Sequence, residues 1–140
     1  ISRFQEACDA VDGLTARTLA VQKGDSILDA AISEIMAQDN PPTALCFHQD
    51  SQAIPLFFRL QRSGLSVPGD ISVTGFDDST FAKEAELTTV RQRPYDMAVD
   101  AAQKALALIE GQPIEEPFET FPVQLQVRNS TAKPRTAPLL

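Results

Sequence analysis

Apolar and amphipathic stretches alternate along the chain in the order expected for strands followed by helices. Short apolar or alternating runs predict strands, which cover residues 17–22, 43–47, 71–76, 87–90 and 123–127. Apolar residues spaced three or four positions apart predict helices, which cover residues 2–11, 26–38, 51–63 and 94–110, with a shorter helical connection over 79–86. This alternation predicts an α/β fold, with a parallel sheet flanked by helices on both faces and right-handed crossovers.

Three of these segments have patterns that also predict their surroundings. Residues 43–47 are nearly all apolar, which is typical of a strand buried on both faces. The helix over 51–63 is apolar on more than one face, so we expect a partner chain to cover what the sheet does not, and Pro55 predicts an irregular helix entry. The helix over 94–110 is expected to turn these side chains inward: Met97, Ala98, Ala101, Ala102, Ala105, Leu108 and Ile109.

The composition limits the class of protein. With 140 residues, 43% of them hydrophobic, the chain has the size and apolar content of one compact domain. Its net charge of −7 argues against this chain gripping a phosphate backbone itself. No apolar run approaches the roughly 20 residues that cross a bilayer, and residues 1–6 lack the pattern of an export signal, so no membrane association is expected. Cys8 and Cys46 have apolar neighbours and are expected to be buried free thiols in a reducing compartment.

Polar residues follow two of the predicted strands at their carboxyl ends. Asp77 and Asp78 come after residues 71–76, and His48, Gln49 and Asp50 come after residues 43–47. Consecutive strands are usually neighbours, and parallel strands end at one edge of the sheet, where open α/β sheets bind ligands. Carboxylates and an amide at such an edge suit the hydroxyl groups of a sugar or the donors of a nucleoside.

Each of these residues also has a purely structural interpretation. Asp50 and Asp78 precede predicted helices and suit the role of helix caps, which leaves Gln49 and Asp77 as the better ligand candidates. His48 suits a core or rim position, and Gln92 suits either the crevice or the surface.

No catalytic chemistry is expected from this sequence. Arg91 and Arg93 are expected to be solvated flanking charges. No serine, cysteine or lysine is paired with His48, which argues against an enzyme, and a single histidine cannot build a multi-histidine metal site, so no metal or cofactor is expected.

Three motifs in combination carry a family resemblance. They are Gly-Leu-Ser-Val-Pro-Gly-Asp-Ile-Ser-Val-Thr-Gly-Phe-Asp-Asp over residues 64–78, Leu-Thr-Thr-Val-Arg-Gln over 87–92 and Val-Arg-Asn-Ser-Thr over 127–131. With them the chain resembles the effector-sensing core of the LacI/GalR family, the lactose-repressor and galactose-repressor type of bacterial transcription regulators. The resemblance extends over nearly the whole chain from Gly24 onward.

The resemblance implies a fold and a set of partners. The fold is a two-lobed, type I periplasmic-binding-protein-like domain, here truncated to roughly its C-terminal lobe. Residues 1–132 would form the effector-binding and dimerisation fragment, the helix over 94–111 would belong to the N-terminal lobe of the intact protein, and 133–140 would be a tail. The implied partners are a sugar or nucleoside effector, a second copy of the chain, and a DNA operator bound through an amino-terminal helix-turn-helix outside this chain, in the cytoplasm.

The resemblance also assigns roles to individual positions. Asp77 matches the acid that contacts the effector, Gln49 stands where an asparagine ligand is usual, and Asp50 matches the acid beside it. Gln92 falls at a cleft position near the crossover between lobes, and Ser26 falls where an aromatic ring often stacks on the ligand. The dimer surface is expected to include Ile54, Phe57, Phe58 and Phe81.

The sequence departs from the family pattern in three respects. The most important is that the DNA-binding domain, the amino-terminal lobe, and the first helix and strand of this lobe are expected to be missing from it. The connection over 79–86 is shorter than usual and lacks a proline pair, and Pro55 replaces a small residue. The leading function from the sequence is ligand-responsive transcriptional control. A solute-binding protein of a transport system, which shares the fold, is the alternative.

Overall fold

The computed structural model describes residues 2–18, 30, 32–34 and 36–136, which fall into two units, 1–41 and 42–140. In the first unit, helix α1 (Ser2–Asp9) ends before Gly13, whose φ of 78° suits a residue without a side chain. Of the strand predicted over 17–22, only residues 17 and 18 are described. Of the helix predicted over 26–38, residues 26–29, 31 and 35 lie outside the described residues, and residues 30, 32–34 and 36 are helical.

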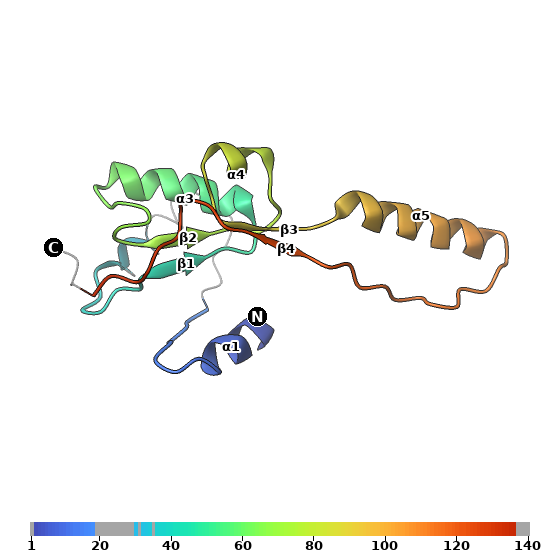
Figure 1. Ribbon diagram of the computed structural model, residues 1–140, viewed down its shortest axis with the longest axis horizontal. Coiled ribbons are helices and arrows are strands. Elements are labelled where there is room, and N and C mark those ends of the chain that lie inside the picture. Colours follow the sequence, from blue (N-terminus) through green and yellow to red (C-terminus); the bar gives the residue numbers. More distant parts are fainter. Residues whose placement is uncertain (1, 19–29, 31, 35, 137–140) are drawn as a thin grey trace. The chain divides into compact units, whose positions relative to one another are not determined.

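The described residues of the second unit form four short strands (Figure 1). They are β1 (Ala44–Cys46), β2 (Ser72–Thr74), β3 (Thr89–Arg91) and β4 (Gln124–Gln126). β1 pairs with β2 in parallel, β3 pairs with β4 antiparallel, and isolated parallel bridges at Thr74–Thr88 and Asp77–Arg91 connect β2 to β3. All four strands lie within predicted runs or overlap them. The prediction of a parallel sheet is confirmed for β1 and β2 and is wrong for the β3–β4 pair.

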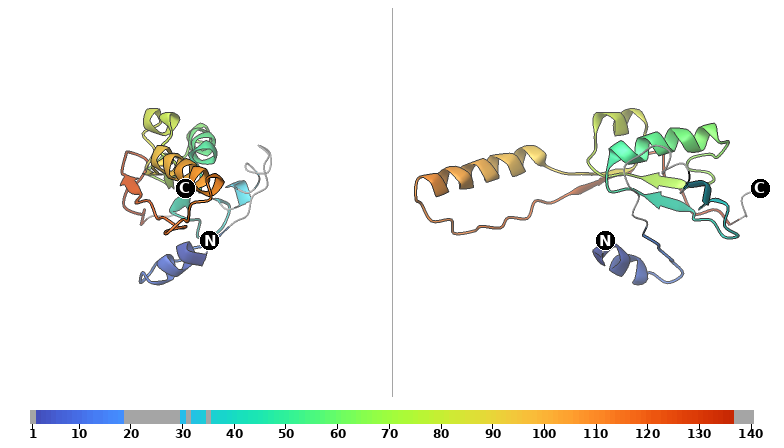
Figure 2. Two further views of the ribbon diagram at one scale, coloured as in Figure 1. Left: turned by 90° about the vertical axis from the view of Figure 1, so that its right-hand side faces the viewer. Right: turned by 180° about the vertical axis from the view of Figure 1, so that it is seen from behind.

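Helices α3 (Asp50–Arg62) and α4 (Thr80–Glu84) lie on one face of these strands (Figures 1 and 2). α3 is continuous through Pro55, which lacks the N–H that would otherwise bond the Ser51 carbonyl. Its first turn is closed by two N–H groups, those of Gln52 and Ala53, which both donate to the Gln49 carbonyl oxygen. A carbonyl shared by two N–H groups is common at helix ends, and α3 runs without a break from Asp50 to Arg62, so the predicted irregular entry is not seen.

The core of this unit lies between α3, α4 and β2. Its buried apolar side chains are Ala53, Leu56, Leu60, Ile71, Val73, Ala82 and Leu87. β2 is the strand enclosed by its neighbours, because it lies between β1 and the bridge to β3, whereas β1 pairs only with β2 in the described sheet. The prediction that residues 43–47 are buried on both faces is therefore wrong. Cys46 is exposed for the same reason, while Cys8, in the other unit, is buried as predicted.

Helix α5 (Pro94–Ile109) follows β3, and the chain returns from it to β4 (Figure 1). The helix has nearly the predicted bounds, but none of its residues is buried, and Leu108 and Ile109 are 64% and 82% exposed. The prediction that its apolar face turns inward is wrong for the described chain, because no other described element packs over that face.

Candidate functional site

The carboxyl ends of β1, β2 and β3 meet at one edge of the sheet. The Asp50 N–H donates to the Phe76 carbonyl oxygen at 2.8 Å, which ties the residues after β1 to those after β2. The Asp77 N–H donates to the Val90 carbonyl oxygen at 2.9 Å, which ties the end of β2 to β3. The prediction that these segments are parallel neighbours is confirmed, and the candidate ligand residues after them share this edge.

Asp77 and Gln92 come together at the edge. The side-chain amide of Gln92 donates to Asp77 Oδ1 at 2.8 Å; Asp77 is exposed and Gln92 is half-buried. Asp77 has a φ of 118°, a backbone conformation that residues other than glycine rarely adopt. One carboxylate oxygen takes part in this hydrogen bond, so the pair presents an acceptor and an amide together at the end of the strands.

Gln49 and His48 lie at the same edge and are exposed. Gln49 is the N-cap residue of α3, with extended backbone angles (φ −151°, ψ 139°), and its side chain does not cap the helix. Within the described part of the chain, no hydrogen bond holds its side-chain amide. Gln49 thus has a rigid backbone position and an unused amide.

Asp50 has a different environment, because its side chain is only 1% exposed. Its Oδ1 accepts from the Thr89 hydroxyl at 2.7 Å and its Oδ2 accepts from the Ser79 N–H at 2.8 Å. The carboxylate therefore joins the start of α3 to β3 and to the start of α4. Asp50 is the first helical residue and not the N-cap, and Ser26, the remaining candidate, lies outside the described residues.

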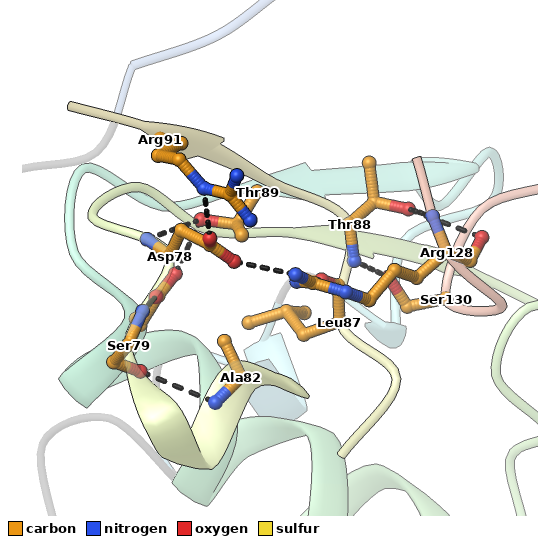
Figure 3. A network of polar contacts seen from close by, with 10 residues as sticks. Asp78, Ser79, Ala82, Leu87, Thr88, Thr89, Arg91, Arg128 and Ser130 are labelled. Atoms are coloured by element: carbon orange, nitrogen blue, oxygen red, sulfur yellow. Dashed lines mark hydrogen bonds and ion pairs between the residues drawn. The ribbon is translucent and has the colours of Figure 1, made fainter. Parts of the chain in front are cut away.

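Asp78 forms a buried ion-pair cluster with two arginines (Figure 3). Arg91 Nε donates to Asp78 Oδ2, and Arg128 Nη2 donates to Asp78 Oδ1. The Asp78 side chain is 2% exposed, whereas that of Arg91 is 45% exposed. The prediction that Asp78 caps a helix is wrong, because Ser79 caps α4 through its hydroxyl, which accepts from the Ala82 N–H at 3.2 Å. Arg91, predicted to be a solvated flanking charge, is exposed and in addition pairs with Asp78.

The pKa of Asp78 lies below the ordinary aspartate value. Burial alone raises this pKa, but the hydrogen bonds from Arg128 and then Arg91, with their positive charges, outweigh burial. Asp78 is therefore ionised at neutral pH, and its negative charge is matched by two guanidinium groups.

The segment after β4 completes this cluster from far along the chain. Arg128 Nη1 also donates to the Leu87 carbonyl oxygen at 2.7 Å. Ser130 accepts from the Thr88 N–H at 2.8 Å (Figure 3). Its hydroxyl also donates to the Val73 carbonyl oxygen at 2.6 Å. In the sequence, residues 127–131 stand out only as part of a family motif. In the structure, Arg128 and Ser130 fix β2 and β3 to each other.

The edge is exposed at His48, Gln49 and Asp77. Two hollows over the described residues lie away from it: one is on α3 beside Pro55 and Phe58, and the other lies between α5 and residues 113–119. Among the described residues, no group of three His, Cys, Asp or Glu is placed to hold a metal ion. None of the helices described is both long and apolar enough to cross a membrane.

The residues predicted for a dimer surface lie on α3 and α4. Phe81 is 74% exposed and Phe58 is 49% exposed, whereas Ile54 and Phe57 are half-buried. The rings of Phe57 and Phe58 meet edge to face with centroids 5.4 Å apart. α3 therefore buries one apolar face against the sheet and leaves aromatic side chains on another.

Comparison with known proteins places these features in a family. Residues 1–131 match the family described as periplasmic binding protein-like domain. The HTH-type transcriptional regulator GalR of Escherichia coli is 35% identical over 139 residues, 94% of this chain and 40% of that protein. The arabinose metabolism transcriptional repressor of Geobacillus stearothermophilus is 40% identical over 97 residues, 67% of this chain and 27% of that protein. The chain thus spans well under half the length of these relatives.

Solved structures show the same relationship. A LacI family transcriptional regulator from Bifidobacterium animalis subsp. lactis is 26% identical with a TM-score of 0.78, over 96% of this chain and 48% of that one. A LacI transcriptional regulator from a Rhodococcus species is 34% identical with a TM-score of 0.64, over 73% of this chain and 38% of that one. The chain belongs to the periplasmic binding protein-like domain family, among the regulators of the LacI/GalR type.

Proposed function

We propose that this chain is the effector-sensing part of a transcriptional repressor, and that the carboxyl edge of β1, β2 and β3 forms one wall of its ligand cleft. The observation that carries the proposal is the Asp77–Gln92 pair, which presents a carboxylate and an amide at the exposed edge where three strands end. Exposed polar side chains at such an edge, here His48, Gln49 and Asp77, are what one wall of a two-lobed cleft provides before the second lobe covers it.

The side chains at this edge favour a sugar or nucleoside effector. Asp77 retains acceptor capacity for a ligand hydroxyl or amine, and the free amide of Gln49 offers both a donor and an acceptor. Gln92 orients Asp77 and completes the wall, with His48 at its margin. Asp50 has both carboxylate oxygens bonded inside the protein, so its contribution is to hold the edge in place. Ser26 stays in the proposed set on the family resemblance alone.

Assembly and DNA binding belong to the same proposal. The aromatic residues Phe57, Phe58 and Phe81, with Ile54, would pair two copies of the chain through α3 and α4. DNA would be read by a helix-turn-helix domain of the full-length protein, which then acts in the bacterial cytoplasm. Effector binding would shift the balance between two forms of the dimer, with a coupling free energy of about 1–3 kcal/mol.

The relatives favour this function over the transport alternative, since those named above are regulators. The side chains of the edge favour binding over catalysis. Asp77 is hydrogen-bonded to Gln92 and Asp78 is paired with arginine, and no nucleophile is bonded to His48 among the described residues.

Thermal shift of the full-length protein tests the ligand site. A panel of aldopentoses, aldohexoses and nucleosides is screened, and at least one of these compounds is expected to raise the melting temperature. Asp77→Ala should weaken the binding free energy of that compound by about 1.5–3 kcal/mol, because a hydrogen bond to a charged group is lost. Asp12→Ala, a change at an exposed acid in the other unit, is the control and should leave the shift intact.

Two results would contradict the proposal. A ligand whose shift is the same in wild type and Asp77→Ala does not bind at this edge. A full-length protein that shows no DNA binding, measured by gel shift on its own upstream region, is not a repressor of the proposed kind.

A further inference from the structure

Asp77 and Asp78 are adjacent in the sequence but lie in opposite environments. Asp77 is exposed and accepts a hydrogen bond from Gln92, whereas Asp78 is buried and binds Arg91 and Arg128 (Figure 3). Arg91 and Gln92 are adjacent in the same way on the neighbouring strand. The ligand edge thus places the exposed Asp77, paired with Gln92, directly beside the buried Asp78, paired with Arg91 and Arg128.

The backbone of Asp77 and Asp78 has an unfavourable conformation. Asp77 has a φ of 118° and Asp78 a φ of 55°, both in the region that glycine favours. Such a conformation persists only where surrounding contacts fix it. Here the Asp77 N–H bonds Val90, the Ser79 N–H bonds Asp50 at 2.8 Å, and the Asp78 carboxylate is held by two arginines.

The two arginines come from different parts of the chain. Arg91 is on β3, 13 positions after Asp78, and Arg128 is 50 positions after it, beyond β4. Arg128 also bonds the Leu87 carbonyl oxygen, so the cluster fixes the end of β2 against the start of β3. Breaking the cluster would release the turn that aims Asp77 outward.

We propose that Asp78, held by Arg91 and Arg128, is the positioning residue of the ligand edge, and that this cluster sets the geometry of the Asp77–Gln92 pair without touching the ligand. The inference rests on the proposed function for its consequence in ligand binding. Its structural part, control of the Asp77 backbone by the Asp78 cluster, is measurable without any ligand.

Hydrogen–deuterium exchange of the 140-residue chain gives the first test. In Asp78→Asn, the amides of Asp77 and Ser79 should exchange about tenfold faster or more relative to the amide of Leu60, a buried residue of α3. A loss of global stability alone would accelerate the Leu60 amide at least as much as the amides of Asp77 and Ser79. Asp70→Asn is the matched control. It removes a carboxylate just before β2 that accepts hydrogen bonds from the N–H and the hydroxyl of Ser66.

Arg91→Gln provides a second variant in case Asp78→Asn does not fold. The Arg91 side chain is 45% exposed and its loss leaves Arg128 on Asp78, so this variant keeps part of the cluster. Arg91→Gln should accelerate exchange of the Asp77 amide selectively. In the double variant with Asp78→Asn it should have little further effect, because both changes break the same Arg91–Asp78 contact. Equal acceleration of Asp77 and Leu60 in these variants, or no acceleration, would overturn the proposal.

Calorimetric titration of the full-length protein with D-galactose and with adenosine gives the second test. Where the wild type binds a probe, Asp78→Asn should weaken it about tenfold and Asp70→Asn should not. Unchanged affinity in Asp78→Asn would overturn the positioning role in binding. If neither probe binds the wild type, the proposed effector class loses support, while the exchange measurement still decides whether the cluster controls the edge.

Discussion

The charge of Asp78 depends on pH in a way that links it to the stability of the protein. Its pKa is lowered in the folded state, so the folded form binds the proton less readily than the unfolded form does. The stabilisation is present above the unfolded aspartate value of about 3.9 and is lost as pH falls toward the lower, folded value. Acid therefore removes the ionic contribution of Asp78, which adds to the backbone hydrogen bonds between β2 and β3.

We expect Asp78→Asn to be less stable than wild type at pH 7 by about 3–5 kcal/mol, because two guanidinium groups lose their buried anion. The difference should shrink as pH falls below about 4, since the wild-type carboxyl then becomes neutral too. Urea unfolding of both proteins between pH 7 and pH 3 measures this difference. A gap that stays constant over the whole range would show that charge is not what Asp78 contributes.

At this scale the sequence revealed some roles and concealed others. The placement of Asp77 after a buried strand predicted its position at the edge, because that depends on neighbouring residues alone. The roles of Asp50 and Asp78 were not predictable, because their partners Ser79, Thr89 and Arg128 are 29, 39 and 50 positions away. Only the pairing of strands brings those groups together.

Among the elements, the end of β2 is packed against the start of α3 with almost no spare room. A Cβ added at Gly75 would collide with Asp50 Oδ1, lie 3.0 Å from Leu87 Cδ2 and lie 3.3 Å from the Asp50 Cα atom. The absence of a side chain at Gly75 is thus what lets the buried Asp50 carboxylate reach Thr89 and Ser79.

Gly75→Ala should destabilise the chain by about 1–3 kcal/mol, because the added methyl group must displace a fully bonded carboxylate. Gly69→Ala is the comparison, since its Cβ would meet only the side chain of Ser66, and it should cost less. Equilibrium unfolding in urea measures both. A larger loss for Gly69→Ala than for Gly75→Ala would contradict this account of the packing.

Helix α3 has two apolar faces with different duties. Leu60 is 1% exposed, so Leu60→Ala should lower the free energy of unfolding by about 2–5 kcal/mol. Phe58 is 49% exposed, and Phe58→Ala should change the stability of the monomer by no more than about 0.5 kcal/mol. Thermal unfolding at low protein concentration separates the two effects, and similar losses for both variants would refute the two-faced description.

The type of each described element was predictable from hydrophobic spacing, because spacing reports local periodicity. Burial was less predictable. The apolar run at 43–47 predicted a central strand, yet β1 has one neighbour in the described sheet, and the apolar spacing of α5 predicted an inward face that nothing described covers. Apolar residues indicate what an element needs to bury, and the identity of the covering surface comes from the rest of the fold.

For the molecule as a whole, the exposed apolar side chains predict self-association of the 140-residue chain. One set lies on α3 and α4, with Phe58 and Phe81, and the other lies on α5, with Leu108 and Ile109. Analytical ultracentrifugation at micromolar concentration should give a mass above that of one chain. Phe58→Ser with Phe81→Ser, and separately Leu108→Ser with Ile109→Ser, should show which face carries the contact, and a single-chain mass for the unmodified protein would refute the prediction.

Fold class and family were predictable at this scale because three separate motifs agree on them, and the match over residues 1–131 supports the same assignment. The cluster around Asp78 was not, because it depends on how β4 returns beside β3. An antiparallel return brings residues 128–131 back to β2, which a prediction of a purely parallel sheet does not contain.

The late position of Arg128 and Ser130 has a consequence for synthesis on the ribosome. β2 emerges from the exit tunnel with its acids and its carbonyl groups long before these partners, which follow 50 and 57 positions behind Asp78 and Val73. Until Arg128 is synthesised, Asp78 lacks one of its two arginine partners in the nascent chain. Native packing of β2 is therefore complete only after residues 128–130 have been added. We expect a message truncated before residue 128 to yield a product that lacks the contacts of Arg128 and Ser130 with Asp78, Leu87 and Val73 and is a target for cellular proteases.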